Sequence, residues 1–187
     1  MALKPEVTNI ISHLLKIEDY NSFKCMNLLD YFLDKYPDAP GSSANHQAYD
    51  GGYYKHISDI LDYAAKMYQY LSKRGNLDFS LSDAILVLFL HDIEKPLKYC
   101  PVLVKTGVVD ESGMIEEEIY EYETDSNEQI RANLINRFGI NLTDEHKIAL
   151  KYIHGEGDDY RKDKSVMSPL SAFCHCCDVI SARIFFE

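Results

Sequence analysis

The stretch that decides the fold is Leu86-Val87-Leu88-Phe89-Leu90-His91-Asp92-Ile93-Glu94-Lys95-Pro96, in which an apolar run delivers a histidine and an aspartate side by side. The run from Ala84 to Leu90 cannot all face water, so it predicts a buried helix through the middle of the fold. It is too short to span a bilayer. An unpaired carboxylate at the end of this helix would be destabilising. A metal ion would remove that cost, because imidazole nitrogen and carboxylate oxygen are good ligands for first-row metals.

Two adjacent residues cannot complete a metal site, because neighbours on a helix point about 100° apart. One further candidate ligand is His56, which follows Gly51-Gly52 at the start of a predicted helix. The two glycines allow a sharp turn or a close backbone approach there. Another candidate is Asp178, in a predicted helix that has no lysine or arginine one turn away. Metal ligation is the natural reason for a carboxylate at such a position.

The order His56, His91-Asp92, Asp178 resembles the HD superfamily of metal-dependent phosphohydrolases. The matching features are the Gly-Gly-x-x-x-His approach, the apolar run before His-Asp-Ile-x-Lys-Pro and the late helical aspartate, and they cover residues 45–185. The resemblance implies an all-α, HD-domain-like helical bundle whose metal is held by these four residues. It also implies hydrolysis of a small phosphorylated metabolite, with a nucleotide as the leading candidate. Many family members have glycine where this chain has Glu94, which weakens any subfamily assignment.

Mixed nitrogen and oxygen ligation without thiolate suits Mn, Fe, Co, Ni or Zn, with one ion expected and two allowed. In the mechanistic hypothesis, the metal bound through Asp92 and its partners activates a water, while Lys95 and His154 stabilise charge on the phosphoryl group. Lys95 could instead be an exposed lysine at a helix end. His154 could bind phosphate, hold a second metal, act as a general acid or lie in a surface turn. The roles of His46, Glu94 and His175 stay open.

Two other functions remain compatible with the sequence. A binuclear-iron oxygenase on the same fold would need further histidines, which His154 and His175 could supply. A non-catalytic sensor or interaction module could keep the metal for structure alone, although a complete set of ligands argues against it. Cys174, Cys176 and Cys177 lack a second cysteine or histidine pair at zinc spacing, so we expect them to be small core residues.

Composition limits the class of protein. The net charge of −11 over 187 residues argues against binding to duplex nucleic acid, which requires a basic face. The N-terminus does not resemble a signal peptide, no segment is long and apolar enough for a membrane span, and five cysteines do not form a disulfide pattern. We therefore expect a cytoplasmic protein without membrane association, whose partner is a small phosphorylated substrate. A homodimer is only a weak expectation.

The length predicts one domain over residues 1–187, with N-terminal helices in 1–40 packing on an HD-like core in 45–185. Apolar periodicity and capping residues predict the helices, which lie at 6–17, 22–36, 53–73, 126–138, 144–153 and 169–185. The central buried helix is capped by Ser80, contains the run from Ala84 to Leu90, and its stretch stops at Pro96. The helix at 169–185 is apolar nearly all round and should be buried. In 144–153, Ile148, Ala149, Tyr152 and Ile153 should face inward. Residues 101–123 could form a small β-hairpin insertion, and the acidic run 110–128 is typical of a solvated face.

Overall fold

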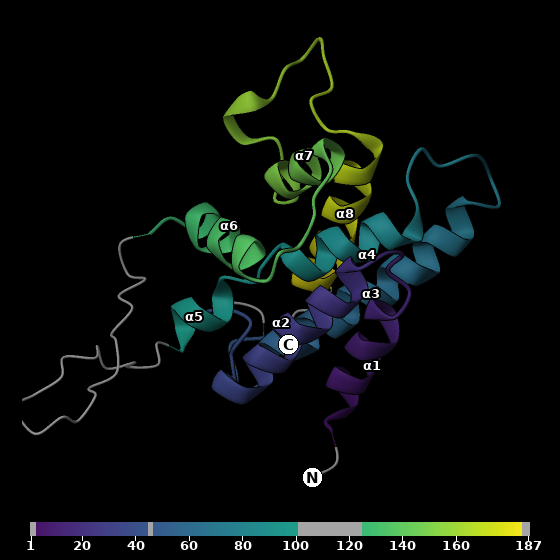
Figure 1. Cartoon of the computed structure of the whole chain (residues 1–187). Helices are drawn as coiled ribbons and strands as arrows, with labels where there is room; N and C mark the ends of the chain where they lie inside the picture. Colours follow the sequence, from purple (N-terminus) through teal and green to yellow (C-terminus); the bar gives the residue numbers. More distant parts are fainter. Residues whose placement is uncertain (1–2, 45–46, 101–124, 185–187) are drawn as a thin grey trace, which may run out of the picture.

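The computed structural model describes residues 3–44, 47–100 and 125–184, and every regular element in these ranges is helical (Figure 1). The prediction of an all-α fold is confirmed for this part of the chain. The predicted hairpin at 101–123 and most of the acidic run lie outside the described residues. The helices are α1 Pro5–Leu14, α2 Asn21–Lys35, α3 Gly52–Leu71, α4 Leu81–Leu90, α5 Lys95–Tyr99, α6 Asn127–Arg137, α7 Asp144–Tyr152 and α8 Pro169–Val179.

Helix α4 forms the centre of the fold, as its apolar sequence predicts. Figure 1 shows it between α3 on one side and α7 and α8 on the other, and its residues contact all three helices. Every side chain from Ala84 to Leu90 is at most 2 % exposed. The helix begins at a capping box, in which Ser80 and Asp83 each bond the backbone amide of the other. Burial on all sides fixes α4, so its C-terminal end has a defined position.

The helices around α4 present apolar faces to it. Helix α3 buries Ile57, Ile60 and Leu61, and α1, which buries Val7 and Ile10, packs against α3. The place of Pro96 after His91-Asp92 suggests that the helical structure ends there. It does not end at Pro96. Pro96 lies in the first turn of the short helix α5, where a missing amide proton costs nothing. The chain therefore leaves α4 through one tight turn and enters α5 at Lys95.

Two predictions about burial are wrong. The segment 169–185 is not buried all round, because Ala172, Cys176 and Val179 face solvent, and after Val179 it continues as a π-helical turn over Ile180–Ile184. In α7, Ile148 is 40 % exposed, whereas His146 is buried. The inward face of α7 is formed by positions 146, 149, 150 and 153, which share one side of a helix. His146 takes this place because it bonds Asp83 of α4.

In the described part of the chain, no helix is both long enough and apolar enough to cross a membrane.

Candidate metal centre

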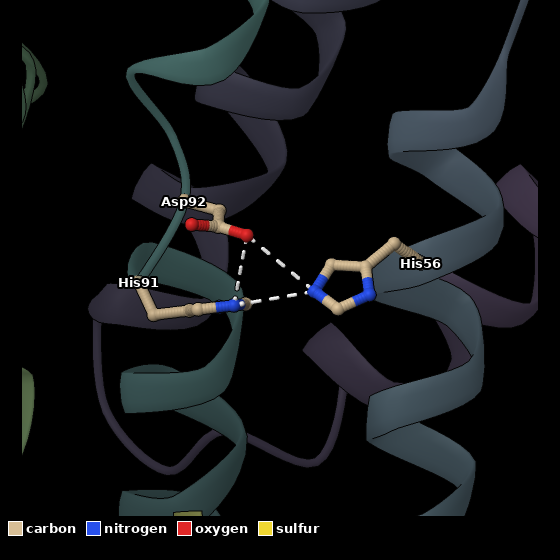
Figure 2. A group of neighbouring side chains, drawn as sticks. All are labelled: His56, His91 and Asp92. Atoms are coloured by element: carbon tan, nitrogen blue, oxygen red, sulfur yellow. Dashed lines mark hydrogen bonds and ion pairs between the residues drawn. The ribbon is translucent and has the colours of Figure 1, made fainter. Parts of the chain in front are cut away.

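Three side chains from two helices meet at the C-terminal end of α4. Figure 2 shows His56 pointing from α3 toward His91 and Asp92, which follow the last residue of α4. Gly51 precedes α3 with a left-handed backbone (φ 81°), a conformation that L side chains rarely adopt. A Cβ on Gly52 would lie 2.0 Å from the carbonyl oxygen of Gln47. The glycine pair thus allows both the turn and the close approach that place His56.

The three donor atoms are close together and buried. Nε2 of His56 lies 3.3 Å from Nε2 of His91 and 3.4 Å from Oδ2 of Asp92. Nε2 of His91 lies 3.0 Å from the same oxygen. This oxygen accepts no hydrogen bond of good geometry from the described residues, although it has ion-pair contacts. A buried carboxylate oxygen is stabilised by nearby cations, and Nζ of Lys95 already lies beside this one.

These separations fit a shared metal ion. First-row metals bind nitrogen and oxygen ligands at about 2.0–2.2 Å, so two ligands of one ion lie about 3.0 Å apart at a right angle and about 3.4 Å apart at the tetrahedral angle. The separations among His56, His91 and Asp92 run from 3.0 to 3.4 Å. The buried group of His56, His91 and Asp92 could therefore hold a metal ion.

The remaining imidazole nitrogens are oriented by hydrogen bonds. Nδ1 of His91 donates to the carbonyl oxygen of Leu88 at 2.7 Å, so the neutral imidazole has its lone pair on Nε2, the nitrogen directed at the group. Nδ1 of His56 lies 3.1 Å from Oγ of Ser181, in the π-helical turn that follows α8. A partner on the second nitrogen fixes the tautomer and the ring orientation, as in protein metal sites generally.

Asp178 of α8 brings a second carboxylate to the two histidines. Its Oδ1 lies 3.4 Å from Nε2 of His56 and 3.6 Å from Nε2 of His91, and the side chain is 14 % exposed. Burial tends to lower the pKa of His91, but the charge of Asp92 and the hydrogen bond that His91 donates to Asp178 outweigh it and raise this pKa to about 10. The group therefore creates a strongly negative environment that favours a cation at these nitrogens.

The two predicted catalytic residues outside the ligand group also lie beside it. Nζ of Lys95 is 2.5 Å from Oδ2 of Asp92 and its side chain is 16 % exposed, so it is not a lysine extended into solvent. His154, after α7, has a 54 % exposed side chain. It approaches the outer carboxylate oxygens, with Nε2 3.7 Å from Oδ1 of Asp92 and Nδ1 3.7 Å from Oδ2 of Asp178. Burial and the charge of His91 lower the pKa of His154.

Several other candidates lie apart from the group. Nδ1 of His175 lies 2.6 Å from the carbonyl oxygen of Ile153, so this nitrogen donates a hydrogen bond to the residue that follows α7. Cys174 and Cys177 are buried core residues, as expected, whereas Cys176 is exposed. Arg161, Lys162 and Lys164 form a basic cluster that is exposed on the loop before α8. His46 lies outside the described residues.

Glu94 is buried and not a solvated side chain, and its Oε2 has no hydrogen-bond partner among the described residues. Burial and the charge of Asp92 raise its pKa to about 7.

Sequence reasoning missed two residues that contact the group from distant elements. Ser181 reaches His56 across 125 positions, and Arg131 reaches the carbonyl oxygen of His91 across 40 positions. Neither residue stands in a motif that could have signalled these contacts. The bond from His91 to Leu88 spans only three residues, so helical geometry alone could have suggested it.

No match to this chain was found among protein-family models, curated proteins or solved structures. Membership of the HD superfamily therefore stays a prediction, carried by the residues quoted above.

Proposed function

We propose that this chain is a metal-dependent phosphohydrolase acting on a small phosphorylated metabolite, with nucleotides as the leading substrate class. The observation that carries the proposal is the convergence of Nε2 of His56, Nε2 of His91 and Oδ2 of Asp92 in a buried group. Asp178 supplies the fourth ligand, and the set suits Mn, Fe, Co, Ni or Zn. The substrate class follows from the resemblance to the HD superfamily.

The metal would supply Lewis-acid chemistry, lowering the pKa of a water in its shell and polarising a phosphoryl oxygen. Asp92 and Asp178 would hold that ion and offset its charge. Lys95, directed at the group from the first turn of α5, donates to the phosphoryl oxygens as negative charge develops on them. Because these groups are already in place, little reorganisation is needed when charge develops.

His154 is placed to act on the leaving group. It is the exposed member of the site and contacts the outer oxygens of both carboxylates, so a substrate entering from solvent meets it early. An imidazole there can hydrogen-bond the oxygen that departs from phosphorus and donate a proton to it.

The test is a screen for phosphate release from phosphomonoesters, deoxynucleotides and cyclic nucleotides, with each of the five divalent metals. We expect metal-dependent hydrolysis of at least one class, and its loss in His56→Ala. Arg74→Ala is the control, since Arg74 stacks on Tyr70 at the far end of α3. A protein that binds metal through this group and releases no phosphate from any class contradicts the proposal.

A second candidate is a binuclear-iron oxygenase. The observation favouring it is that His154 lies 3.7 Å from Oδ1 of Asp92 and from Oδ2 of Asp178, the oxygens that face away from the histidine pair. His154 and the two carboxylates would hold a second ion there. Two irons per chain together with substrate-dependent oxygen consumption would favour this function, and phosphate release with one metal per chain would exclude it.

A further inference from the structure

Arg131 of α6 binds the peptide group that joins the two adjacent ligands. Its Nη1 donates a hydrogen bond to the carbonyl oxygen of His91, and this carbonyl belongs to the peptide between His91 and Asp92. His91 is the C-cap residue that follows α4, where carbonyls have no partner within the helix. Rotation of this peptide would move the imidazole and the carboxylate together, so the bond fixes both side chains at once.

The contact is part of a wider attachment of α6 to the segment that follows α4. Nζ of Lys98, in α5, lies 3.1 Å from Oδ1 of Asn127. Asn127 precedes Arg131 by four residues, so both lie on one face of α6. This face therefore holds the chain on each side of Lys95.

We infer that Arg131 is a positioning residue of the metal centre, which orients His91 and Asp92 through their shared peptide group. The inference rests on the proposed metal site but not on phosphate chemistry. Partners that orient metal ligands typically change metal affinity by about 10- to 100-fold when they are removed. Arg131 belongs to α6, whereas His91 and Asp92 follow α4. Arg131 can therefore fix their peptide group relative to a second helix.

The experiment compares the full-length wild type with Arg131→Met, which keeps the apolar stem and removes every donor. Co²⁺ is the probe. Its Kd is measured by competition with a chelating dye, and its visible absorption spectrum reports the geometry around the ion. We expect Arg131→Met to weaken binding by about 10-fold or more and to change the spectrum. Arg131→Lys, which keeps a charged donor, should recover part of the affinity.

Arg137→Met is the matched control, because Arg137 lies on the same helix and stacks on Tyr31, away from the site. It should bind Co²⁺ as the wild type does. The melting temperature of each metal-free protein shows whether α6 has loosened. Wild-type affinity and spectrum in Arg131→Met overturn the inference, whatever the melting temperature. A protein that binds Co²⁺ and hydrolyses no phosphoester overturns the proposed function, while weaker binding by Arg131→Met still supports the role of Arg131.

Discussion

The two ends of α4 each carry an aspartate beside a histidine, but the two pairs differ in how their hydrogen bonds are satisfied. At the N-terminal end, Oδ2 of Asp83 accepts bonds from the amide and hydroxyl of Ser80, at 2.8 and 2.7 Å, and Oδ1 lies 2.9 Å from Nε2 of His146. At the C-terminal end, Oδ2 of Asp92 is buried and has ion-pair contacts, to Nζ of Lys95 at 2.5 Å and to Nε2 of His91 at 3.0 Å. The first pair is held by directed hydrogen bonds at a helix cap, whereas the second belongs to a buried cluster of charged groups around one oxygen.

This difference separates a structural pair from a candidate site. Asp83 is partly exposed and its donors come from a helix cap and a neighbouring helix, so it stabilises the junction of α4 with α7. Asp92 is buried against two imidazoles and Lys95, and a nitrogen of each of these side chains lies close to Oδ2 of Asp92. A histidine next to an aspartate is therefore weak evidence for metal binding by itself, and the informative feature is the convergence of several side chains on one buried carboxylate oxygen.

The largest expected effect comes from Asp92→Asn, which keeps the shape of the side chain and removes its charge. Because the proposed Lewis-acid chemistry contributes several kcal/mol, we expect hydrolysis to fall by at least about 1,000-fold. The measurement is the initial rate of phosphate release at saturating metal. Asp83→Asn, the equivalent change at the other end of α4, should retain the rate. Equal losses in both variants would mean that the two ends do not differ in function.

Lys95→Met should give the next largest effect. Removing one preorganised donor to a developing oxyanion costs about 100- to 1,000-fold in kcat, and Lys95 is the cation closest to Oδ2 of Asp92. Metal affinity should not fall, because the variant removes a positive charge beside the ligand group. Steady-state kinetics together with Co²⁺ titration separate these two quantities. A loss of metal binding with unchanged kcat would assign Lys95 to the structure of the site instead.

Removal of the metal should lower the stability of the protein, and this effect should depend on the ligands at the C-terminal end of α4 and not on Asp83 at its N-terminal end. Metal at about 100 times its Kd stabilises the folded state by about 2.7 kcal/mol. In a chain of this size that corresponds to a shift in melting temperature of about 5–10 °C. Thermal unfolding with metal and with chelator measures it. The shift should persist in Asp83→Asn and vanish in His91→Ala, and a shift that persists in His91→Ala would place the metal elsewhere.

The two ends of α4 also show which parts of the molecule the sequence could predict. The apolar run and the Ser80 cap are local signals, so the place and burial of α4 followed directly from them. The approach of Lys95 and His154 to Asp92 was proposed from the family resemblance, and the structure brings these residues together. Their roles in catalysis stay predictions.

The contacts that sequence reasoning missed depend on which surfaces meet. Arg131 and Ser181 are ordinary polar residues in their own helices, and only the packing of α6 and α8 brings them to His91 and His56. The exposed face of α8 has the same origin, since an apolar sequence does not say which side of a helix lacks a neighbour. Ile148 was assigned inward because it is apolar, but His146 has a partner inside the fold.

The smallest expected effect concerns the stability of the N-terminal end of α4. Burial raises the pKa of Asp83, but the bonds from Ser80 and His146 outweigh it and lower this pKa below its ordinary value. A lowered pKa means that the ionised carboxylate stabilises the fold above about pH 4, and that this contribution is lost as the pH falls through the folded-state pKa. Asp83→Asn turns an amide donor toward either Ser80 or His146, so it should reduce the free energy of unfolding by about 1 kcal/mol at pH 7. Urea unfolding of both proteins between pH 7 and pH 3 measures the difference in their free energies of unfolding. This difference should shrink toward the acid end. A difference that is constant with pH would mean that the charge of Asp83 does not contribute.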